Sequence, residues 1–548
     1  VEGGGGGLGS NSWVVAGEHT ASGAPLLSND PHLGSSLPSV WHQVGLHCRT
    51  VGPACPFDVT GFSFSGLPGV VIGHNDRIAW GFTNLGADVM DLYVERVDET
   101  TYEVDGERLP LETRVERIEV AGGEPVELTV RSTANGPIVS DVLEVPGATG
   151  AVSLRWTALE PGRTADSLFA LNAARDWTQF REALRFFDVP GQNVVYADVE
   201  GNIGYQATGR VPIRAAGDGR APAPGWTGTH GWTGTIPYDD MPSVLNPEPG
   251  WIVTANNAVV EGRAFTYDWS RGYRSQRIRE LLEAEIASGP VDAAAMQRVA
   301  LDSRVAFADD LVPALLRVDD SPAADLLRGW DGEHGVGSAP AAYFNAVWRH
   351  LLIRTFDDEL TGAAQPSGGD RWFEVVRALL DDADDPYWDD VTTPARETRD
   401  DTLRAAVADA TAELTDRLGD DPASWRWGDL HRLELTHATL GTSGVAPVEW
   451  LFNRGPYPVS GSRDAVDAKS WDAQEGYEVT AVPSMRMVVD LADLDASRWI
   501  DHTGVSGHAF HENYADQTPA WSRGETRPMP FTAGAVEAAA EHTLTLRP

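Results

Sequence analysis

The sequence predicts an α+β protein in which a β-rich core is interrupted by a helical lobe. From Trp13 to about Leu159, short apolar runs rich in β-branched residues are separated by Gly, Pro, Asn and Asp, which is typical of strands and turns. After Tyr273 the apolar spacing changes to that of helices, and this continues to about Leu418. Strand-like runs return from Leu433, so we expect the end of the chain to rejoin the core.

These changes of pattern divide the chain into four parts. They are a glycine-rich spacer end at 1–9, a β-rich core at 10–270 that includes a hairpin-rich stretch at 92–159, a helical lobe at 271–425, and a C-terminal return to the core at 426–548. The return to strands after the helical excursion favours one compact protein over separable domains.

The strands of the core are expected to be short, because turn residues interrupt every apolar run. We expect them at Trp13–Ala16, Pro25–Ser28, Val40–His47, Asp58–Ser65, Val70–Gly73, Ile78–Phe82, Asn193–Tyr205, Gly250–Thr254 and, most clearly, Met485–Asp490. Strong alternation within 92–159, as in Thr113–Val120, indicates antiparallel hairpins. The Gly, Pro and Trp residues of 215–237 indicate a loop.

Helices are indicated wherever apolar residues recur at intervals of three and four. Two are expected within the core, at Ala165–Ala174 and Trp177–Phe187. Those of the lobe are expected at Ser275–Ser288, Val291–Leu301, Ala306–Leu316, Ala323–Trp330, Ala341–Phe356, Arg371–Asp382 and Asp400–Leu418.

The chain is strongly acidic, with 81 acidic and 42 basic residues and a net charge of −39 over 548 residues. Such a surface repels nucleic acid and anionic membranes, and no apolar run approaches the ~20 residues that span a bilayer. Lys469 is the only lysine. Two explanations stay open: a high-GC genome combined with a solubilising acidic coat, or adaptation to high salt.

Two cysteines, Cys48 and Cys55, flank a turn marked by Gly52-Pro53. The turn could bring the sulfur atoms together in a disulfide, which would suit an exported protein. Two free thiols or a weak metal pair are the alternatives. Tetrahedral zinc is not indicated, because no second Cys-Cys or Cys-His pair accompanies them.

The most informative stretch is the glycine run Gly3–Gly7, which leads through Gly9 to Ser10 and a strand around Val14-Val15. This arrangement is expected if the Gly9–Ser10 bond is cut. A terminal serine carries its own base, because an α-amino group with a pKa of about 7.7–8.0 can accept the proton of the attacking hydroxyl. The alternative is an ordinary flexible linker followed by a serine that merely starts a strand.

Several motifs in order along the chain resemble the β chain of the penicillin acylase family of N-terminal-nucleophile hydrolases. They are Ser10–Val15, Leu27–Leu33, Gly69–Asn75 with Trp80-Gly81, Tyr196–Asp198 with Gly201–Tyr205, Asn256-Asn257, and Tyr514–Gln517. The resemblance implies a four-layer αββα sandwich with an inserted helical lobe. It also implies autocatalytic cleavage after Gly9 and a separate α chain from the same precursor.

The resemblance assigns roles to five residues. Ser10 would be the nucleophile, and the side-chain amide of Asn256 and the backbone N–H of Asn84 would hold the oxyanion. His32 and Arg274 would organise the terminal amine. Three of them have a simpler alternative: Asn256 as a turn asparagine, His32 as a core histidine and Arg274 as a surface arginine at the start of a helix. Weaker candidates around them are Asn257, Gln192 and Asn193.

A structural calcium ion, one per heterodimer, is also implied. Its ligands would be Asp88, the carbonyl of Met90, Asp91, the carbonyl of Pro212 and Asp268, with one further carboxylate from the α chain. Calcium prefers about six to eight hard oxygen ligands, which this set could supply.

The expected activity is that of an acylase, acting on an amide of β-lactam, N-acyl homoserine lactone or lipopeptide type. A histidine at position 32 favours a bulky or long acyl chain over phenylacetyl groups. Because Val1–Gly9 has neither a basic start nor an apolar centre, we expect an export signal on an upstream segment. The alternative is an uncleaved, non-catalytic ligand-binding relative on the same scaffold.

Other catalytic patterns do not match. Gly61–Gly66 misses the Gly-x-Ser-x-Gly elbow, and no His-Glu-x-x-His occurs. The glycine run lacks the Lys-Ser/Thr of a phosphate-binding loop. His508 and His511 suggest a metal only weakly, because they lie in a Gly/Asn-rich loop without helical support.

Overall fold

Two seven-stranded sheets form the centre of the protein in the computed structural model, which describes residues 8–547 except 146, 148 and 261–264. The first sheet contains β1 (Gly9–Val15), β2 (Leu26–Gly34), β21 (Trp251–Thr254), β24 (Ala481–Pro483), β25 (Met485–Asp490), β26 (Arg498–Asp501) and β27 (Arg527–Pro528). The second contains β4 (Trp41–His47), β5 (Asp58–Phe64), β6 (Ile72–Asn75), β7 (Ile78–Asn84), β15 (Gln192–Asp198), β16 (Ile203–Ala207) and β20 (Ser243–Leu245).

The first sheet is buried on both faces, as the alternation of β1 shows. Val14 packs into the core shared with the second sheet, whereas Trp13 and Val15 pack against α3 (Tyr273–Ser288) and α4 (Ala293–Ala300). Successive residues of a strand point to opposite faces. The continuous burial of Ser10–Val15 in β1 therefore shows a strand covered on both sides.

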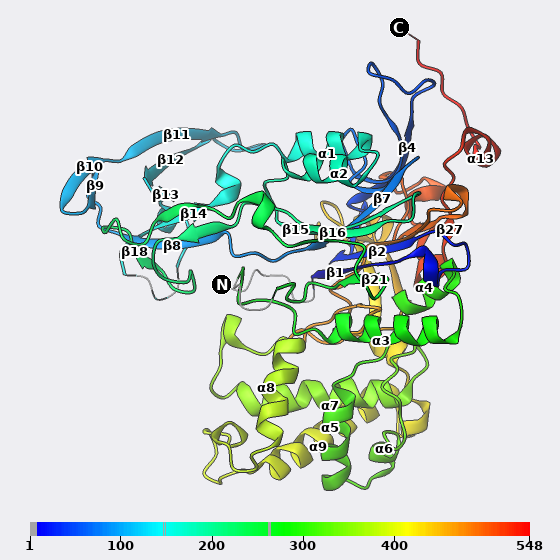
Figure 1. The fold of residues 1–548 in the computed structure, drawn as a ribbon. Helices are drawn as coiled ribbons and strands as arrows, with labels where there is room; N and C mark the ends of the chain where they lie inside the picture. The colour runs from blue at the N-terminus through cyan, green and yellow to red at the C-terminus, as the bar shows by residue number, and fades with distance from the viewer. Residues whose placement is uncertain (1–7, 146, 148, 261–264, 548) are drawn as a thin grey trace.

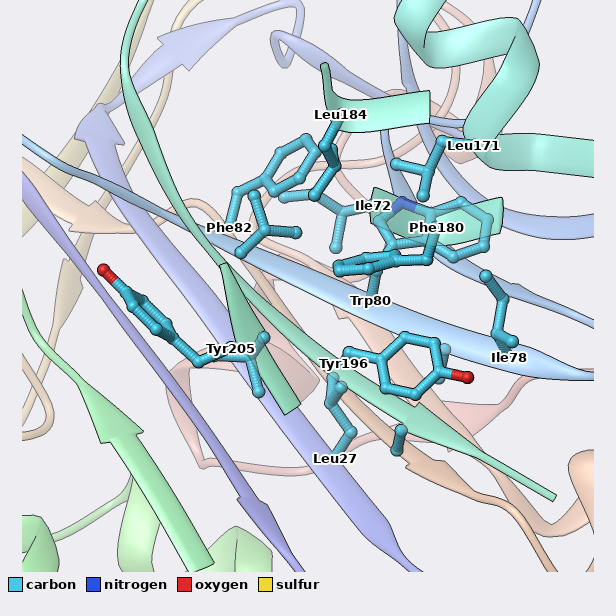
Figure 2. Close-up of a cluster of buried hydrophobic side chains, with 14 of the residues drawn as sticks. Leu27, Ile72, Ile78, Trp80, Phe82, Leu171, Phe180, Leu184, Tyr196 and Tyr205 are labelled. Atoms are coloured by element: carbon cyan, nitrogen blue, oxygen red, sulfur yellow. The ribbon is translucent and has the colours of Figure 1, made fainter. Parts of the chain in front are cut away.

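The second sheet is covered on its outer face by α1 (Thr164–Ala173) and α2 (Trp177–Leu184). Figure 2 shows Trp80 below Leu171 and Leu184, which these helices supply, with Leu27 on the opposite side. At Gly81 an added Cβ would lie 2.7 Å from Ser12 Oγ, so a glycine lets the two sheets approach closely there. The order helix, sheet, sheet, helix confirms the four-layer αββα prediction.

The helical lobe has a core of its own and lies below the sheets in Figure 1. It contains α5 (Ala308–Val318), α6 (Pro322–Asp325), α7 (Ala339–Phe356), α8 (Asp370–Leu380), α9 (Arg399–Leu418) and α10 (Trp427–Leu430). The helix expected at Ala323–Trp330 is only the short α6. After Asp325 the backbone continues in turns in which Leu326, Leu327 and Arg328 each donate to the carbonyl three residues back. Gly329, with a left-handed φ of 71°, follows these turns.

The hairpins predicted within 92–159 are confirmed, and they extend away from the sandwich in Figure 1. They comprise β8 (Met90–Glu95), β9 (Thr101–Val104), β10 (Glu107–Pro110), β11 (Glu112–Ile118), β12 (Val126–Thr133), β13 (Gly136–Pro137) and β14 (Ala151–Trp156). The loop prediction for 215–237 was partly wrong. The segment holds β18 (Ala223–Pro224) and β19 (Trp232–Thr235), which pair with β8 and with β17 (Pro212–Arg214).

The C-terminal part contains helices that the sequence pattern did not reveal, because each is short. They are α11 (Ala446–Phe452), α12 (Thr518–Ser522) and α13 (Ala533–Ala539). A small sheet joins β3 (Ser36–Leu37), β22 (Arg432–His437) and β23 (Arg454–Pro458). The predicted disulfide between Cys48 and Cys55 is present. Among the described residues, the helices are all too short or too polar to cross a membrane.

Candidate active site

Ser10 lies at the start of β1, buried in the first sheet. The register with β2 places Gly9 opposite His32 and Ser10 opposite Pro31. The Ser10 nitrogen donates to Asn256 Oδ1 at 2.7 Å. The residue predicted as nucleophile and the residue predicted as oxyanion donor are therefore in direct contact, although 246 positions separate them.

Asn256 follows β21 in a tight turn and adopts a left-handed φ of 64°. The neighbouring Asn257 stabilises this turn, because its Oδ1 accepts from the Ala255 N–H at 3.1 Å. The Asn256 amide orientation is fixed: Oδ1 accepts from Ser10 and Arg274, and Nδ2 donates to Asn84 O at 2.9 Å. An amide nitrogen has two hydrogens, so one is left to bind an oxyanion.

Asn84 ends β7, and its backbone faces the side on which Asn256 lies. The next residue, Leu85, donates its N–H to Gly191 O. Because N–H groups alternate in direction along a strand, the Asn84 N–H points away from β15. Its carbonyl points the same way and accepts from Asn256. The Asn193 side chain contacts that carbonyl at 3.3 Å and supports it from β15, whereas Gln192 lines the nearby cavity.

Arg274 lies in the first turn of α3 and is only 5% exposed, so it is not a surface arginine. One guanidinium nitrogen donates to Ser10 O at 2.8 Å and to Asn11 Oδ1 at 2.7 Å, and the other to Asn256 Oδ1 at 2.9 Å. Burial lowers the pKa of this guanidinium, and Asp464, Asp370 and Asp30 oppose the shift. Arg274 thus holds the nucleophile strand and the oxyanion residue together.

Gly9 fits between these groups only because it lacks a side chain. An added Cβ would lie 2.9 Å from Arg274 Nη2, 3.0 Å from Asn256 Oδ1 and 3.4 Å from His32 Nδ1. Three of the five residues that the resemblance assigned to the site therefore surround Gly9, next to the Gly9–Ser10 bond.

His32 is fully buried, with its Nε2 directed away from Ser10. That nitrogen lies 3.2 Å from Asn11 Nδ2 and 3.4 Å from Asp30 Oδ2. Burial lowers the pKa of the His32 ring well below its usual value, and the nearby cations Arg274, Arg486 and Lys469 lower it further. The ring is therefore neutral at physiological pH, with Nδ1 on the side of Gly9.

A cavity of about 990 Å³ opens beside Ser10. One wall, from the second sheet and the helices that cover it, is apolar and is formed by Trp41, Phe64, Val71, Ile72, Phe82, Leu85, Leu168 and Phe187. The other wall, from the lobe and the C-terminal part, is polar and charged and includes Asp268, Arg271, Asp370, Arg463, Asp464, Asp472 and Glu475. A molecule with an apolar part and a polar part could thus contact both kinds of wall beside Ser10.

The residues predicted to bind calcium do not form a cage in this arrangement. Arg214 contacts both Asp88, at 3.0 Å, and Asp91, at 2.9 Å. Asp268 lies 2.9 Å from Arg371 and its side chain is mostly exposed. The other two donors, Met90 and Pro212, are strand residues of β8 and β17. The set does not fit a cation unless Arg214 is displaced, and the calcium ion stays a prediction.

His508 and His511 are also not arranged to bind a metal ion together. Each Nδ1 accepts a backbone N–H two residues ahead, from Phe510 and Asn513. Within the described residues, no group of three or more His, Cys, Asp or Glu side chains could hold a metal ion.

Two buried residues around the site were not predicted from the sequence. Asn11 links Arg274 to His32, and Asp30 lies beside both Asn11 and His32. Both lie within the motifs that carry the family resemblance: Asn11 follows Ser10, and Asp30 precedes His32 by two residues. The signal that could have found them is polarity at positions of β1 and β2 that are otherwise buried.

The fold and this site together define a class of protein: a four-layer αββα sandwich with a serine at the start of a central strand. Residues 4–538 match the penicillin amidase family model, and the chain belongs to that family.

Relatives and a solved structure agree with this assignment. The chain is 30% identical to "Acyl-homoserine lactone acylase QuiP" of Pseudomonas aeruginosa over 95% of its own length and 66% of that protein. It is 34% identical to "Penicillin acylase 2 proenzyme" of Pseudomonas sp. (strain SE83), over 99% of the chain and 69% of the relative. A thermostable penicillin G acylase from Alcaligenes faecalis shares the fold, with a TM-score of 0.72 and 22% identity over 98% of this chain and 99% of that one.

Proposed function

We propose that the mature protein is an amidohydrolase that uses Ser10, freed by autocatalytic cleavage after Gly9, to hydrolyse the amide bond of an N-acylated small molecule. The observation that carries the proposal is the convergence of the Ser10 nitrogen, the Asn256 amide and the Arg274 guanidinium. Relatives named as acylases support the same reaction class.

The reaction follows from the chemistry of a terminal serine. The Ser10 hydroxyl attacks the amide carbonyl and its proton passes to the α-amino group. Asn256 Nδ2 and the Asn84 N–H donate to the oxyanion. The α-ammonium group then protonates the leaving nitrogen, and the C–N bond breaks to leave an acyl ester on Ser10. Water attacks this ester, the α-amine takes its proton, and the acid leaves as the proton returns to the serine oxygen.

The groups around the Ser10 nitrogen suit its role as the base. Asn256 Oδ1, which accepts from the Ser10 N–H in the uncut chain, would orient the amine after cleavage. The neighbouring guanidinium of Arg274 would lower the pKa of that amine by repulsion between like charges. A lower pKa keeps more of the amine neutral, and only the neutral amine can act as the base.

The substrate is proposed to carry an apolar acyl group. The apolar wall of the cavity, which includes Phe82 and Phe187, would receive it, and the charged wall would receive the leaving group. An amide of β-lactam, N-acyl homoserine lactone or lipopeptide type fits this division. The buried His32 favours the bulky acyl groups over phenylacetyl groups.

The chain spans about two thirds of the length of the curated relatives it matches first, at 66%. We therefore propose that an upstream segment of the same precursor forms a separate α chain, and that the two chains make a heterodimer. The disulfide between Cys48 and Cys55 supports export to an oxidising compartment.

Replacing Ser10 tests the proposal. We expect the Ser10→Ala variant of the precursor to stay uncut after Gly9 and to lose hydrolysis of acyl amides by more than about a thousandfold. N-terminal sequencing and a panel of acyl chains on one chromogenic amine would measure both. Cleavage or activity that persists in this variant would contradict the proposal. A wild-type protein that stays uncut and binds the amides unchanged would instead be a binding relative.

A further inference from the structure

A cluster of buried charged groups lies next to the nucleophile strand, where Asp30 of β2 pairs with Asn11 of β1, and the proposed reaction uses none of it. Asp30, Asp467, Lys469 and Arg486 are each at most 3% exposed. They come from β2, from the segment before β24, and from β25, which pairs with β2. Charged groups are rarely buried this deeply unless they are paired.

Three of the four pair with one another. Asp467 accepts from Arg486 Nη2 at 2.8 Å on one oxygen, and from Lys469 and Ser460 on the other. Trp521 stacks against both cations, with Lys469 Nζ 5.3 Å and Arg486 Cζ 5.1 Å from its ring centre. These contacts hold the three charged side chains of the triad in place near β2.

Asp30 interacts electrostatically with Arg486 and Asp467 of the triad and contacts Asn11 and His32. Its Oδ2 lies 3.4 Å from both Asn11 Nδ2 and His32 Nε2, and its Oδ1 has no hydrogen-bond partner in the described structure. Burial raises the pKa of this carboxyl well above its usual value, against the attraction of Arg486 and Arg274. A buried carboxyl group that is so poorly satisfied is costly to the fold, which points to a role at the site.

The orientation of Asn11 decides which atoms face one another. Arg274 can only donate, so the Asn11 oxygen faces Arg274 and its nitrogen faces the cluster. One hydrogen of that nitrogen goes to Val466 O at 3.0 Å, beside Asp467. The other faces His32 Nε2 and Asp30 Oδ2. The contact of 3.4 Å between His32 Nε2 and Asp30 Oδ2 holds a proton of its own, on the ring or on the carboxyl group, and so ties the ring to Asp30.

We propose that Asp30 is a positioning residue, whose carboxyl group fixes the Asn11 amide and the His32 ring and through them Arg274 and Ser10. This inference rests on the proposed function, because it assigns Asp30 to that reaction. Asp30 touches neither the nucleophile nor the cavity, so it acts only through Asn11 and His32.

The test compares Asp30→Ala with Asp30→Asn. Alanine removes the acceptor and leaves space beside His32, so we expect kcat to fall by at least about tenfold with KM changed by less than about threefold. Asparagine keeps an oxygen acceptor and the same shape, so we expect kcat to return to within about threefold of the wild type. If Asp30→Ala does not fold, Asp30→Ser is measured with the same expectation.

Asp501→Ala is the matched control. Asp501 is a fully buried aspartate on β26 of the same sheet and bonds to Thr503, away from the active site. We expect it to lower the thermal midpoint as much as Asp30→Ala does, with kcat unchanged. Equal kcat in Asp30→Ala and the wild type would overturn the inference. So would a loss of kcat in Asp501→Ala equal to that in Asp30→Ala.

A crystal structure of Asp30→Ala gives a measurement that does not depend on activity. We expect the Asn11 amide and the His32 ring to rotate, with the Arg274 contact to Asn11 broken. If these side chains move but the wild type hydrolyses no acyl amide, the proposed function fails while the positioning role stands. If the wild type is active and the variant structure is unchanged, the positioning role alone fails.

Discussion

At the scale of single residues, the site is built from polar groups that each satisfy more than one partner. Asn256 Oδ1 accepts from both Ser10 and Arg274, and Arg274 donates to three acceptors. Such shared contacts are costly to break, since removing one partner leaves another buried polar group unsatisfied. For the same reason, the residue that precedes Ser10 has to be small, because a side chain at Gly9 would disturb the contacts of Arg274 and Asn256.

The first prediction concerns Gly9. We expect Gly9→Val to slow cleavage of the precursor by at least about tenfold, because a side chain here would displace Arg274 and Asn256 from the bond to be cut. A time course of precursor cleavage on a denaturing gel measures this. Leu8→Val is the control, since Leu8 is largely exposed, and it should be cut at the wild-type rate. Unchanged cleavage of Gly9→Val would show that the contacts at Gly9 do not matter.

At the scale of elements, strands supply the nucleophile and helices hold it in place. Strand β1 carries Ser10, and its neighbour in the sheet, β21, ends next to Asn256. Helix α3 delivers Arg274 from its first turn. The segment before α3 is in turn held by α8, because Asp370 accepts from Ser270 Oγ at 2.9 Å and from the Arg271 N–H at 2.7 Å.

The second prediction concerns this contact between the lobe and the core. We expect Asp370→Ala to lower kcat/KM about tenfold and the free energy of unfolding by about 1 to 3 kcal/mol, because the segment before Arg274 loses its acceptor. Asp370→Asn keeps an oxygen acceptor and should retain most of the wild-type kcat/KM and most of the wild-type free energy of unfolding. Kinetics and denaturant unfolding measure the two effects. An alanine variant as active as the wild type would mean that α8 does not position Arg274.

At the scale of the whole molecule, the cavity exists because distant parts of the chain meet. Its apolar wall comes from the second sheet and the helices that cover it, and its charged wall from the lobe and from residues 463–475. Neither wall would form a pocket alone. The same packing buries several titratable groups and leaves the large excess of acidic residues on the outside, and both have consequences for stability.

The third prediction concerns acid. Burial lowers the pKa of His74 and His334 to about 4 and that of His431 to about 3. In the unfolded chain these histidines bind protons near pH 6.5, as histidine ordinarily does. Between about pH 6.5 and pH 4 the unfolded chain therefore holds more protons than the folded protein. Stability is therefore full above about pH 6.5 and is lost as the pH falls, by up to about 1.4 kcal/mol per pH unit for each histidine.

Denaturant unfolding at pH 7 and pH 5 measures this effect. We expect the free energy of unfolding of His334→Gln to fall less between pH 7 and pH 5 than that of the wild type, because the variant lacks one buried histidine with a lowered pKa. The exposed His542→Gln is the control and should follow the wild type. Equal losses in the wild type and His334→Gln would contradict the assignment to buried histidine.

The fourth prediction concerns salt. With a net charge of −39, self-repulsion opposes folding, and salt screens it. We expect the thermal midpoint to rise by several degrees between about 0.05 M and about 1 M NaCl. Sucrose at equal osmolality, which screens no charge, is the control. A midpoint that does not change with salt would favour a merely solubilising acidic coat over adaptation to high salt.

The sequence by itself determined the local features of this protein. Alternation and helical spacing depend only on near neighbours, and they predicted the hairpins of 92–159 and most helices of the lobe correctly. The Gly9–Ser10 junction was visible because a flexible run meets an apolar strand there. The family motifs added Asn256 and Arg274, which the structure brings together at Ser10.

Only the tertiary structure decided how these residues are held. Asn11 and Asp30 gain their partners from Arg274, Val466 and His32, which reach them through sheet pairing and helix packing. The family resemblance predicts Asp88 and Asp91 as calcium ligands, and only the fold shows that both contact Arg214. The physical reason is that a side chain's partners are fixed by contacts between distant segments, and these leave no periodic trace in the chain.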